Sequence, residues 1–378
     1  MLEILFWLSA GVLVYIYAGY PLVLLVATRF SKKTVAKGSF TPTVSIIIPA
    51  FNEAAVIAET IENKLALDYP EGKLEIIVVS DESTDGTDEI VEKYSARGVK
   101  LIRQEPRQGK TSGLNLAVPE ASGEIIVFSD ANSIYGHDAL LRLTSNFADE
   151  TVGYVTGKMI YVSADGSVVG DGCSAYMKYE NYIRSMESAL NSVVGVDGGV
   201  DAVRSSLYQQ MRADQLPDFV LPLSVASKKY RVVYEPAAIL KEQSLSDADS
   251  EYRMRVRVAL RAMWALLDMC HLLNPFRYPV YSWQLLSHKI LRYMAFLPLI
   301  ALFVSNAMLL GQAPYGLLFA GQIIFYCLAG FCLYSSKDDM PFYFSLPYYF
   351  VLLNVSCANA FWRFIRGQKQ IIWNPRLG

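Results

Sequence analysis

The run Val44-Ser-Ile-Ile-Ile-Pro-Ala-Phe-Asn-Glu53 decides the fold, because a β-branched strand leads directly into polar residues and a helical pattern. A second run of this kind, Leu74-Glu-Ile-Ile-Val-Val-Ser80, leads into Asp81-Glu-Ser-Thr-Asp-Gly-Thr87. Further strands are expected at 100–103 and 124–129, and helices at 53–67 and 85–96. Strands that alternate with such helices predict βαβ units and a mainly parallel sheet covered on both faces.

Polar side chains gather where three of these strands end. The first strand ends at Glu53, the second at Asp81, and the strand at 124–129 in Asp130-Ala-Asn132. The carboxyl ends of parallel strands meet at one edge of a sheet, where ligands bind. Each acid alone has a second interpretation as a turn or a helix N-cap. Three of them at one edge indicate a binding site.

Apolar residues are unevenly distributed along the chain of 378 residues, of which 53% are hydrophobic. Residues 4–28 carry no charge and are long enough to cross about 30 Å of hydrocarbon as a helix. Residues 293–336 and 341–362 predict about three further spans, with buried core helices as the alternative, strongest for the last stretch. The expected domains are an N-terminal anchor over 1–30, a catalytic domain over 42–248, interfacial helices over 249–292, transmembrane helices over 293–366 and a tail over 367–378.

Flanking charges predict the side of the membrane on which the catalytic domain lies. The first apolar stretch is too long for a signal peptide and has no basic residue before it, so we expect a retained anchor. Arg29 to Lys37 follow this stretch, and Lys289 and Arg292 precede the next, which places the domain in the cytoplasm. Three complete C-terminal spans would put the basic tail on the opposite side, and the sequence leaves this conflict open. A net charge of -2 predicts no nucleic-acid partner.

The chain resembles the family 2 glycosyltransferases with a GT-A fold, over about residues 43–264. The resemblance implies an α/β, Rossmann-like domain for nucleotide-diphospho-sugars, flanked by α-helical transmembrane segments in a bacterial inner membrane. It further implies inverting transfer from a UDP-sugar to a lipid-linked or oligosaccharide acceptor, with Mg²⁺ or Mn²⁺ as cofactor and membrane lipids as a second partner.

The resemblance also assigns the donor site. The expected nucleotide-binding residues are Ala50, Glu53, Asp81, Lys110 and Asp130. A carboxylate such as Asp81 can accept the uracil N3–H, and Lys110 can face a diphosphate, with a solvated lysine as the alternative. Asp130 and Asn132 take the place of the family's Asp-x-Asp metal motif. The amide of Asn132 offers a metal an oxygen ligand without a charge.

The base and the acceptor site are expected later in the chain. Asp218, in Gln215-Leu-Pro-Asp218, matches the family's aspartate that deprotonates the acceptor hydroxyl, with a helix N-cap after Pro217 as the alternative. Gly198 and Gly199 match a glycine-rich segment that lets the backbone approach a sugar closely.

A helical pattern over 251–273 carries the expected phosphate ligands Arg257 and Arg261, which lie one turn apart. Processive members of the family have Gln-x-x-Arg-Trp here, but Val258 and Ala262 replace the glutamine and the tryptophan. Trp264 is the expected substitute as a stacking platform for the acceptor. An interfacial helix whose arginines meet lipid headgroups is the alternative, and one helix can do both.

Three functions remain open. The first is addition of one or a few sugars to a lipid-linked acceptor in surface or exopolysaccharide assembly, which the altered Gln-x-x-Arg-Trp pattern favours. The second is a processive synthase that exports its polymer, which the C-terminal spans favour. The third is a catalytically inactive membrane partner that binds nucleotide.

Overall fold

Four parallel strands form one half of an eight-stranded sheet in the computed structural model, which describes residues 1–162, 172–243, 248–331 and 342–370. In sheet order they are β3 (Val99–Arg103), β2 (Leu74–Ser80), β1 (Val44–Ala50) and β4 (Ile125–Phe128). Val44 pairs with Leu74 on one side and with Ile125 on the other. All residues of β1 are buried, as expected of a strand covered on both faces.

The other half of the sheet is mixed rather than parallel. Its strands follow β4 in the order β7 (Asp201–Arg204), β6 (Val152–Val162), β8 (Arg231–Gln243) and β5 (Ile134–Tyr135). Strand β7 runs antiparallel to both β4 and β6, whereas β6 and β8 are parallel. The expectation of a mainly parallel sheet is therefore correct only for the first half.

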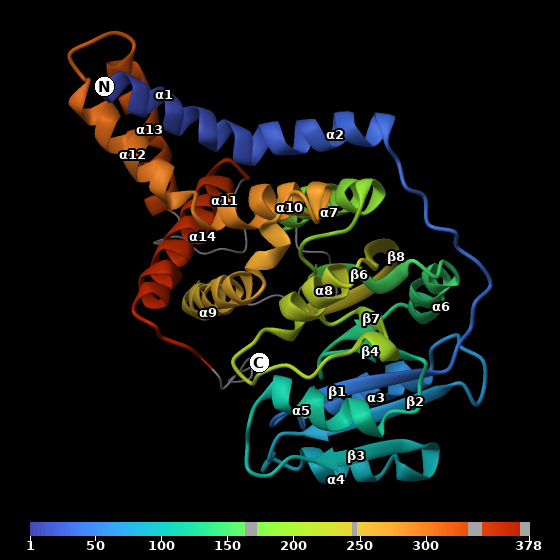
Figure 1. The fold of residues 1–378 in the computed structure, drawn as a ribbon. Helices are drawn as coiled ribbons and strands as arrows, with labels where there is room; N and C mark the ends of the chain where they lie inside the picture. Colours follow the sequence, from blue (N-terminus) through green and yellow to red (C-terminus); the bar gives the residue numbers. More distant parts are fainter. Residues whose placement is uncertain (163–171, 244–247, 332–341, 371–378) are drawn as a thin grey trace.

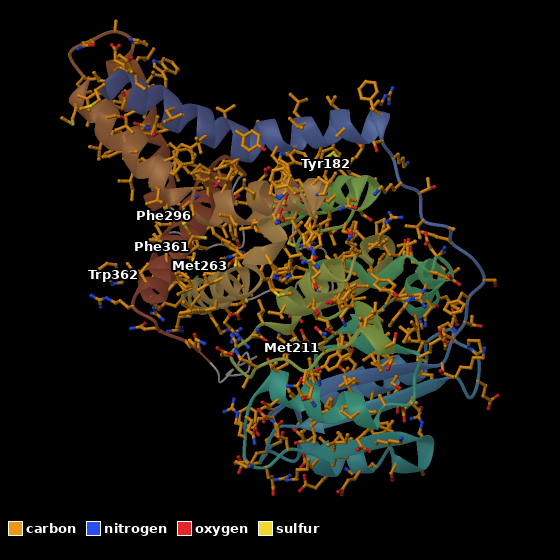
Figure 2. The ribbon with its side chains drawn as sticks, in the orientation of Figure 1. Tyr182, Met211, Met263, Phe296, Phe361 and Trp362 are labelled. Carbon is orange, nitrogen blue, oxygen red and sulfur yellow. The ribbon has the colours of Figure 1, made fainter. Side chains whose placement is uncertain are left out.

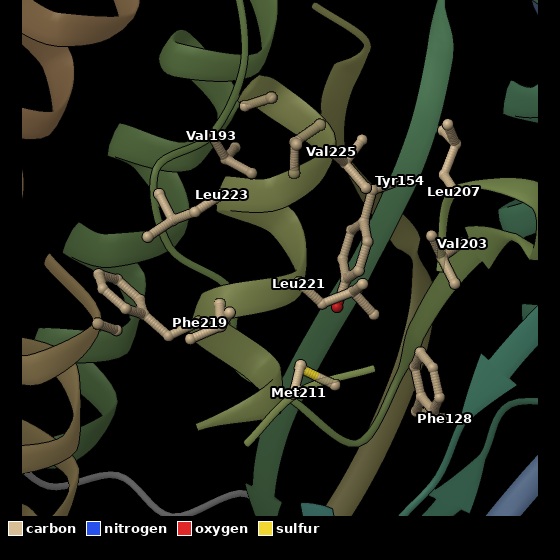
Figure 3. Packing of buried hydrophobic residues seen from close by; sticks show 14 of the residues in the cluster. Phe128, Tyr154, Val193, Val203, Leu207, Met211, Phe219, Leu221, Leu223 and Val225 are labelled. Carbon is tan, nitrogen blue, oxygen red and sulfur yellow. The ribbon is translucent and has the colours of Figure 1, made fainter. Parts of the chain in front are cut away.

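Helices cover both faces of the sheet and bury two apolar cores. They are α3 (Ile57–Leu65), α4 (Thr87–Glu92), α5 (Lys110–Ala117), α6 (Ala139–Ser145) and α8 (Pro217–Ser227). Ile46 and Ile48 belong to one core and Ile47 to the other, as the alternation of side chains along a strand requires. Figure 3 shows the second core, in which Phe128 of β4 and Phe219 of α8 flank Met211.

A layer of largely apolar helices lies on one side of this α/β domain (Figure 1). It contains α1 (Leu2–Val14), a π-helical turn (Tyr15–Gly19), α2 (Tyr20–Phe30), α7 (Gly172–Leu190), α9 (Ala248–Asp268), α10 (Pro279–Leu285), a second π-helical turn (Leu286–Ile290), α11 (Leu291–Tyr293), α12 (Phe296–Met308), α13 (Tyr315–Phe331) and α14 (Phe342–Ile365). Tyr20 and Leu24 of α2 pack on Met186 of α7, so the first long helix rests on the domain. The rings of Phe296 and Phe361 join α12 to α14, while Trp362 points outward (Figure 2).

One helix in the described part of the chain, Leu2–Phe30, is long and apolar enough to cross a membrane. Pro279–Tyr293 and Phe296–Met308 pass the same test only together, with a bend of 55° between them, and Tyr315–Phe331 is apolar but shorter. Helix α14, which contains Pro347 and Asn354, is not among these candidates. The three separate C-terminal spans expected from the sequence are therefore not confirmed.

The C-terminal tail returns to the α/β domain. The indole Nε1 of Trp264 donates a hydrogen bond to the carbonyl oxygen of Gln368 at 2.9 Å. Lys369 Nζ lies 2.5 Å from Asp214 Oδ2, in the loop before α8. These contacts place the start of the tail beside α9 and the loop before α8.

Candidate active site

The loops after β1 and β2 hold each other in place at the edge of the sheet. The backbone N–H of Glu53 donates to Thr87 Oγ1 at 2.9 Å, and that of Ala54 donates to Asp85 Oδ2 at 2.9 Å. Asp85 Oδ1 in turn accepts a hydrogen bond from the hydroxyl of Thr87. Glu53, one of the predicted nucleotide ligands, is thereby fixed at the rim of a cavity.

The carboxylate of Asp81 accepts its hydrogen bonds from groups within the protein. Its carboxylate accepts hydrogen bonds from the side chain of Gln104 and from the backbone N–H groups of Gln108 and Gly109, the latter two at 2.9 and 3.0 Å. Asp81 is 4% exposed and its own N–H donates to the carbonyl of Ala50, which is buried in the core. The contacts of Asp81 and Ala50 with a nucleotide stay predictions, since in this structure Asp81 orders the loop before α5.

The chemical centre combines three segments that are far apart in the sequence. Lys110, the first residue of α5, lies 2.6 Å from Asp130 Oδ1 and 3.8 Å from Asp218 Oδ2. Gly198 and Gly199 have positive φ angles of 83° and 74°, which glycine adopts without a steric cost. A Cβ at Gly198 would lie 2.7 Å from Asp218 Oδ2, so a side chain here would displace the predicted base.

The charges of this centre are strongly coupled. Burial raises the pKa of the Asp218 carboxyl, against the nearby Lys110 ammonium, and Asp130 raises it further. Burial also disfavours the charged form of Lys110, but the carboxylates of Asp130 and Asp218 outweigh it and raise the pKa of this lysine. Asp218 is therefore a carboxyl of elevated basicity beside a lysine that stays charged, which suits a general base.

Asp201, on β7, is an acid that the sequence reasoning did not select. It is 1% exposed, and in the described part of the chain neither of its carboxylate oxygens has a hydrogen-bond partner. It pairs across the sheet with Thr156 of β6. Burial raises the pKa of Asp201, and the charge of Asp218 raises it further. The signal in the sequence is one acid inside the apolar run Val200-Asp-Ala-Val203.

The two predicted phosphate ligands have different surroundings. Arg261 is 7% exposed and donates hydrogen bonds to the carbonyls of Asp214 and Ala213, at 3.2 and 3.3 Å, so it clamps the loop before α8. Burial, followed by the charge of Arg257, lowers the pKa of Arg261 to about 10. Arg257 lines the cavity, and no hydrogen bond or ion pair to it is found among the residues described. Arg257 is therefore the arginine available to an anion.

Trp264 lies outside the cavity, contrary to the expected role as a stacking platform for the acceptor. Its ring packs edge-on against Phe364 at 4.7 Å between centroids, and Lys369 lies over it at 4.9 Å. Ala262, at the position of the family's tryptophan, is buried in the core. Helix α9 turns Trp264 toward α14 and the tail, because a shift of two residues moves a side chain about 200° around a helix.

One cavity of about 370 Å³ collects most of the predicted residues. At one end it is lined by Glu53, Lys110, Asp130, Asn132, Asp218, Arg257 and Arg261. It continues between α7, α9 and α14, where its lining includes Tyr176, Glu180, Arg184, Lys289, Tyr293 and Cys357. The cavity thus has one end at the sheet edge and a second end under the apolar helices.

The end of the cavity at the sheet edge suits a hard divalent cation that a phosphate-bearing ligand helps to hold. The described residues contain no group of three His, Cys, Asp or Glu side chains that could hold a metal alone. Asp130, whose side chain is one-third exposed at 34%, and Asn132 both present oxygen atoms to the cavity. Mg²⁺ needs only one or two protein carboxylates when substrate phosphates complete its octahedron. The residues present therefore fit such an ion.

A mixed α/β sheet brings acids, a lysine and an arginine to one cavity at its edge, and the fold is GT-A-like. Residues 45–198 match the model of Glycosyl transferase family 2. The family that the sequence motifs indicated therefore matches this part of the central domain.

Known relatives cover part of the chain. It is 32% identical over 167 residues to the beta-monoglucosyldiacylglycerol synthase of Nostoc sp., across 43% of this chain and 36% of that protein. It is 24% identical over 238 residues to the poly-beta-1,6-N-acetyl-D-glucosamine synthase of Staphylococcus epidermidis, across 59% of this chain and 57% of that protein. The chain therefore spans less than two thirds of the length of these relatives.

Among solved structures, the chain resembles the mannosyltransferase PcManGT from Pyrobaculum calidifontis, in complex with GDP-Man and Mn²⁺. The TM-score is 0.75 at 22% identity, and the match covers 97% of this chain and 100% of the other. The likeness shows a shared fold that includes the apolar helices.

Proposed function

We propose that this chain transfers a sugar, with inversion at the anomeric carbon, from a UDP-sugar to a lipid-linked or oligosaccharide acceptor in the synthesis of a surface glycan or glycolipid. The observation that carries the proposal is Asp218, a carboxyl of raised pKa that faces the same cavity as Lys110 and Asp130. A base of this kind is what an inverting displacement requires on the acceptor side of the sugar.

The residues divide the reaction between them. Asp218 takes the proton of the acceptor hydroxyl while that oxygen bonds to the anomeric carbon and the bond to the nucleoside diphosphate breaks. Lys110 and Arg257 bind and neutralise the departing diphosphate. A divalent cation at Asp130 and Asn132, when bound, supplies further charge neutralisation to the phosphates. Glycines at 198 and 199 leave room for the sugar beside the base.

Apolar surface supports a location at a membrane, and the basic residues between Arg29 and Lys37 favour the cytoplasmic side for the α/β domain. Ile4 and Leu8 of α1, Ile300 of α12, and Leu317 and Ile324 of α13 are all more than half exposed. Side chains of this kind on several adjacent helices are suited to contact with lipid. Membrane lipids are therefore partners of this layer.

The structure gives less support to uridine as the nucleotide of the donor than to Asp218 as the base. Asp81, the expected acceptor of the uracil N3–H, has its oxygens occupied by the loop before α5. The structural neighbour from Pyrobaculum was solved with GDP-Man. The donor test therefore includes a guanosine nucleotide beside the uridine ones.

A processive synthase is the second candidate. The cavity favours it by extending beyond Asp218 into the helical layer, and so does the likeness to a poly-N-acetylglucosamine synthase. Product length separates the two, since a ladder of long chains would exclude single addition. An inactive nucleotide-binding partner is the third candidate, and any turnover that depends on Asp218 excludes it.

The test is release of nucleoside diphosphate by the purified, detergent-solubilised full chain. Each of a panel of UDP-sugars and GDP-mannose is supplied with Mn²⁺ or Mg²⁺, with and without a membrane lipid extract. We expect release from one UDP-sugar, stimulated by lipid and lost in EDTA. Release from GDP-mannose alone would refute the donor, and binding of nucleotides without turnover under every condition would refute the transferase.

A further inference from the structure

The second end of the cavity is lined by charges that are almost all paired within the protein. The two terminal guanidinium nitrogens of Arg184, Nη1 and Nη2, donate to the carboxylate of Asp197. Glu180 binds Arg292 and also His288, whose Nε2 lies 3.1 Å from Glu180 Oε2. These pairs neutralise one another, and they need no ligand to balance them.

Lys289 is the exception at this end. It lines the cavity and is partly buried, and its ammonium lies over the ring of Phe219, 5.8 Å from the centroid. The described residues offer this ammonium neither a hydrogen bond nor an ion pair. A Cβ added at Gly195 would overlap the lysine Nζ, so the glycine makes the room that the ammonium occupies. Lys289 lies on the π-helical turn Leu286–Ile290, and such turns interrupt α-helices frequently at functional sites.

An ammonium in this position favours an anionic ligand. A charge that is partly withdrawn from water is stabilised by an opposite charge, so an anion that enters the cavity offers Lys289 the ionic partner that the described residues do not provide. Lysine is a common ligand of phosphate groups, as a point charge. Beside it, Tyr293, Leu353 and Cys357 form a largely apolar wall toward α14. The local chemistry therefore combines one cation with an apolar passage.

We propose that Lys289 forms an anion subsite at the acceptor end, which binds the phosphate of an acceptor whose apolar chain lies toward α14. The inference rests on the proposed function and narrows it, because it names a phosphate-bearing amphiphile as the acceptor class. The phosphate on Lys289 positions this acceptor within the cavity that also holds Asp218.

Binding without any sugar donor tests the subsite. The solubilised full chain is titrated with farnesyl monophosphate, with farnesol and with inorganic phosphate, by calorimetry. We expect wild type to prefer farnesyl monophosphate to farnesol by about ten- to hundred-fold, the size of one charge-assisted contact. In Lys289→Met this preference disappears, and in Lys289→Arg part of it returns. Lys178→Met, at an exposed lysine of α7 outside the cavity, keeps it.

Two further measurements separate binding from structure. Lys289→Met replaces an unpaired ammonium by an apolar chain of similar size, so its melting temperature is expected to equal or exceed that of wild type. Gly195→Ala retains the lysine but displaces its ammonium, and is expected to weaken farnesyl monophosphate binding.

Three results would overturn the inference. They are equal binding of farnesol and farnesyl monophosphate by wild type, an undiminished preference in Lys289→Met, and inorganic phosphate binding as tightly as farnesyl monophosphate. The last would remove the apolar half of the subsite. Since no donor is present, these outcomes are independent of whether the chain releases a nucleotide.

Discussion

Two acids that follow parallel strands of the same sheet have opposite surroundings. Asp81, after β2, is 4% exposed and accepts hydrogen bonds from the loop that contains Gln108 and Gly109. Asp130, after β4, has a side chain that is 34% exposed, contacts Lys110 and faces the cavity. The difference separates a carboxylate that holds the protein together from one that remains accessible to a ligand.

The same distinction applies to the arginines of α9. Both arginines line the cavity, but Arg261 donates to backbone carbonyls before α8, whereas no hydrogen bond or ion pair to Arg257 is found among the described residues. Position at a strand end or on a helix face is therefore a weak guide to function. The hydrogen bonds already made by a side chain decide whether it can bind anything else.

The largest effect is expected at Asp218. Asp218→Asn removes the base while it keeps the size of the side chain, so kcat should fall by about 10²- to 10⁴-fold. The melting temperature should not fall, because the variant removes a buried carboxyl whose charged form is disfavoured. Nucleotide-release kinetics and thermal unfolding measure both. A kcat within a few-fold of wild type would show that another group is the base.

The comparison of Asp130 with Asp81 predicts that substitution of the first lowers activity and substitution of the second lowers stability. Asp130→Asn should lower kcat by about 10²-fold, since it weakens the charge at the diphosphate site, with little change in stability. Asp81→Asn should lower the free energy of unfolding by about 1–3 kcal/mol, because backbone N–H groups lose a charged acceptor. Chemical denaturation and metal-dependent kinetics distinguish them. If Asp81→Asn were as stable as wild type but had a raised KM for the donor, the result would support the predicted contact between Asp81 and the uracil ring.

The two arginines of α9 should also differ, with Arg257 affecting donor binding and Arg261 affecting stability. Arg257→Ala should raise the KM for the donor by about ten-fold, the value of one charged contact, and leave the melting temperature unchanged. Arg261→Ala should lower the free energy of unfolding by about 1–3 kcal/mol, because the carbonyls of Ala213 and Asp214 lose their donor. An Arg257→Ala variant with an unchanged KM would contradict the assignment.

The smallest effect concerns stability against pH at Asp201. The pKa of its carboxyl is raised in the folded protein, so the folded state keeps a proton that the unfolded state releases above about pH 4. Stability contributed by this group is therefore complete at low pH and declines as the pH rises toward the raised pKa. Asp201→Asn should melt at a higher temperature than wild type at pH 7 and lose this advantage at pH 3. An advantage that is independent of pH would contradict the protonated carboxyl.

Part of the fold and of the site was predictable from local sequence. The β-branched runs at 44–50 and 74–80 are buried strands, and Asp130, Lys110 and Asp218 meet in one cavity as their motifs implied. Trp264 was not predictable, because its direction depends on how α9 packs against α14. Lys289 was counted only as a flanking charge, since nothing in its neighbourhood along the chain indicates a cavity.

Local sequence was enough to predict the alternation of strands and helices, the long apolar first helix and the family that the central domain matches over residues 45–198. These follow from periodicity and from motifs that are short and contiguous. Packing decided that the hydrogen-bonding capacity of Asp81 is used within the protein while Asp130 is accessible, and that the tail lies beside the domain. It also decided that Lys289 faces the cavity with neither a hydrogen bond nor an ion pair among the described residues. The physical reason is that hydrogen-bond saturation and charge pairing depend on groups far apart in the chain, which only packing brings together.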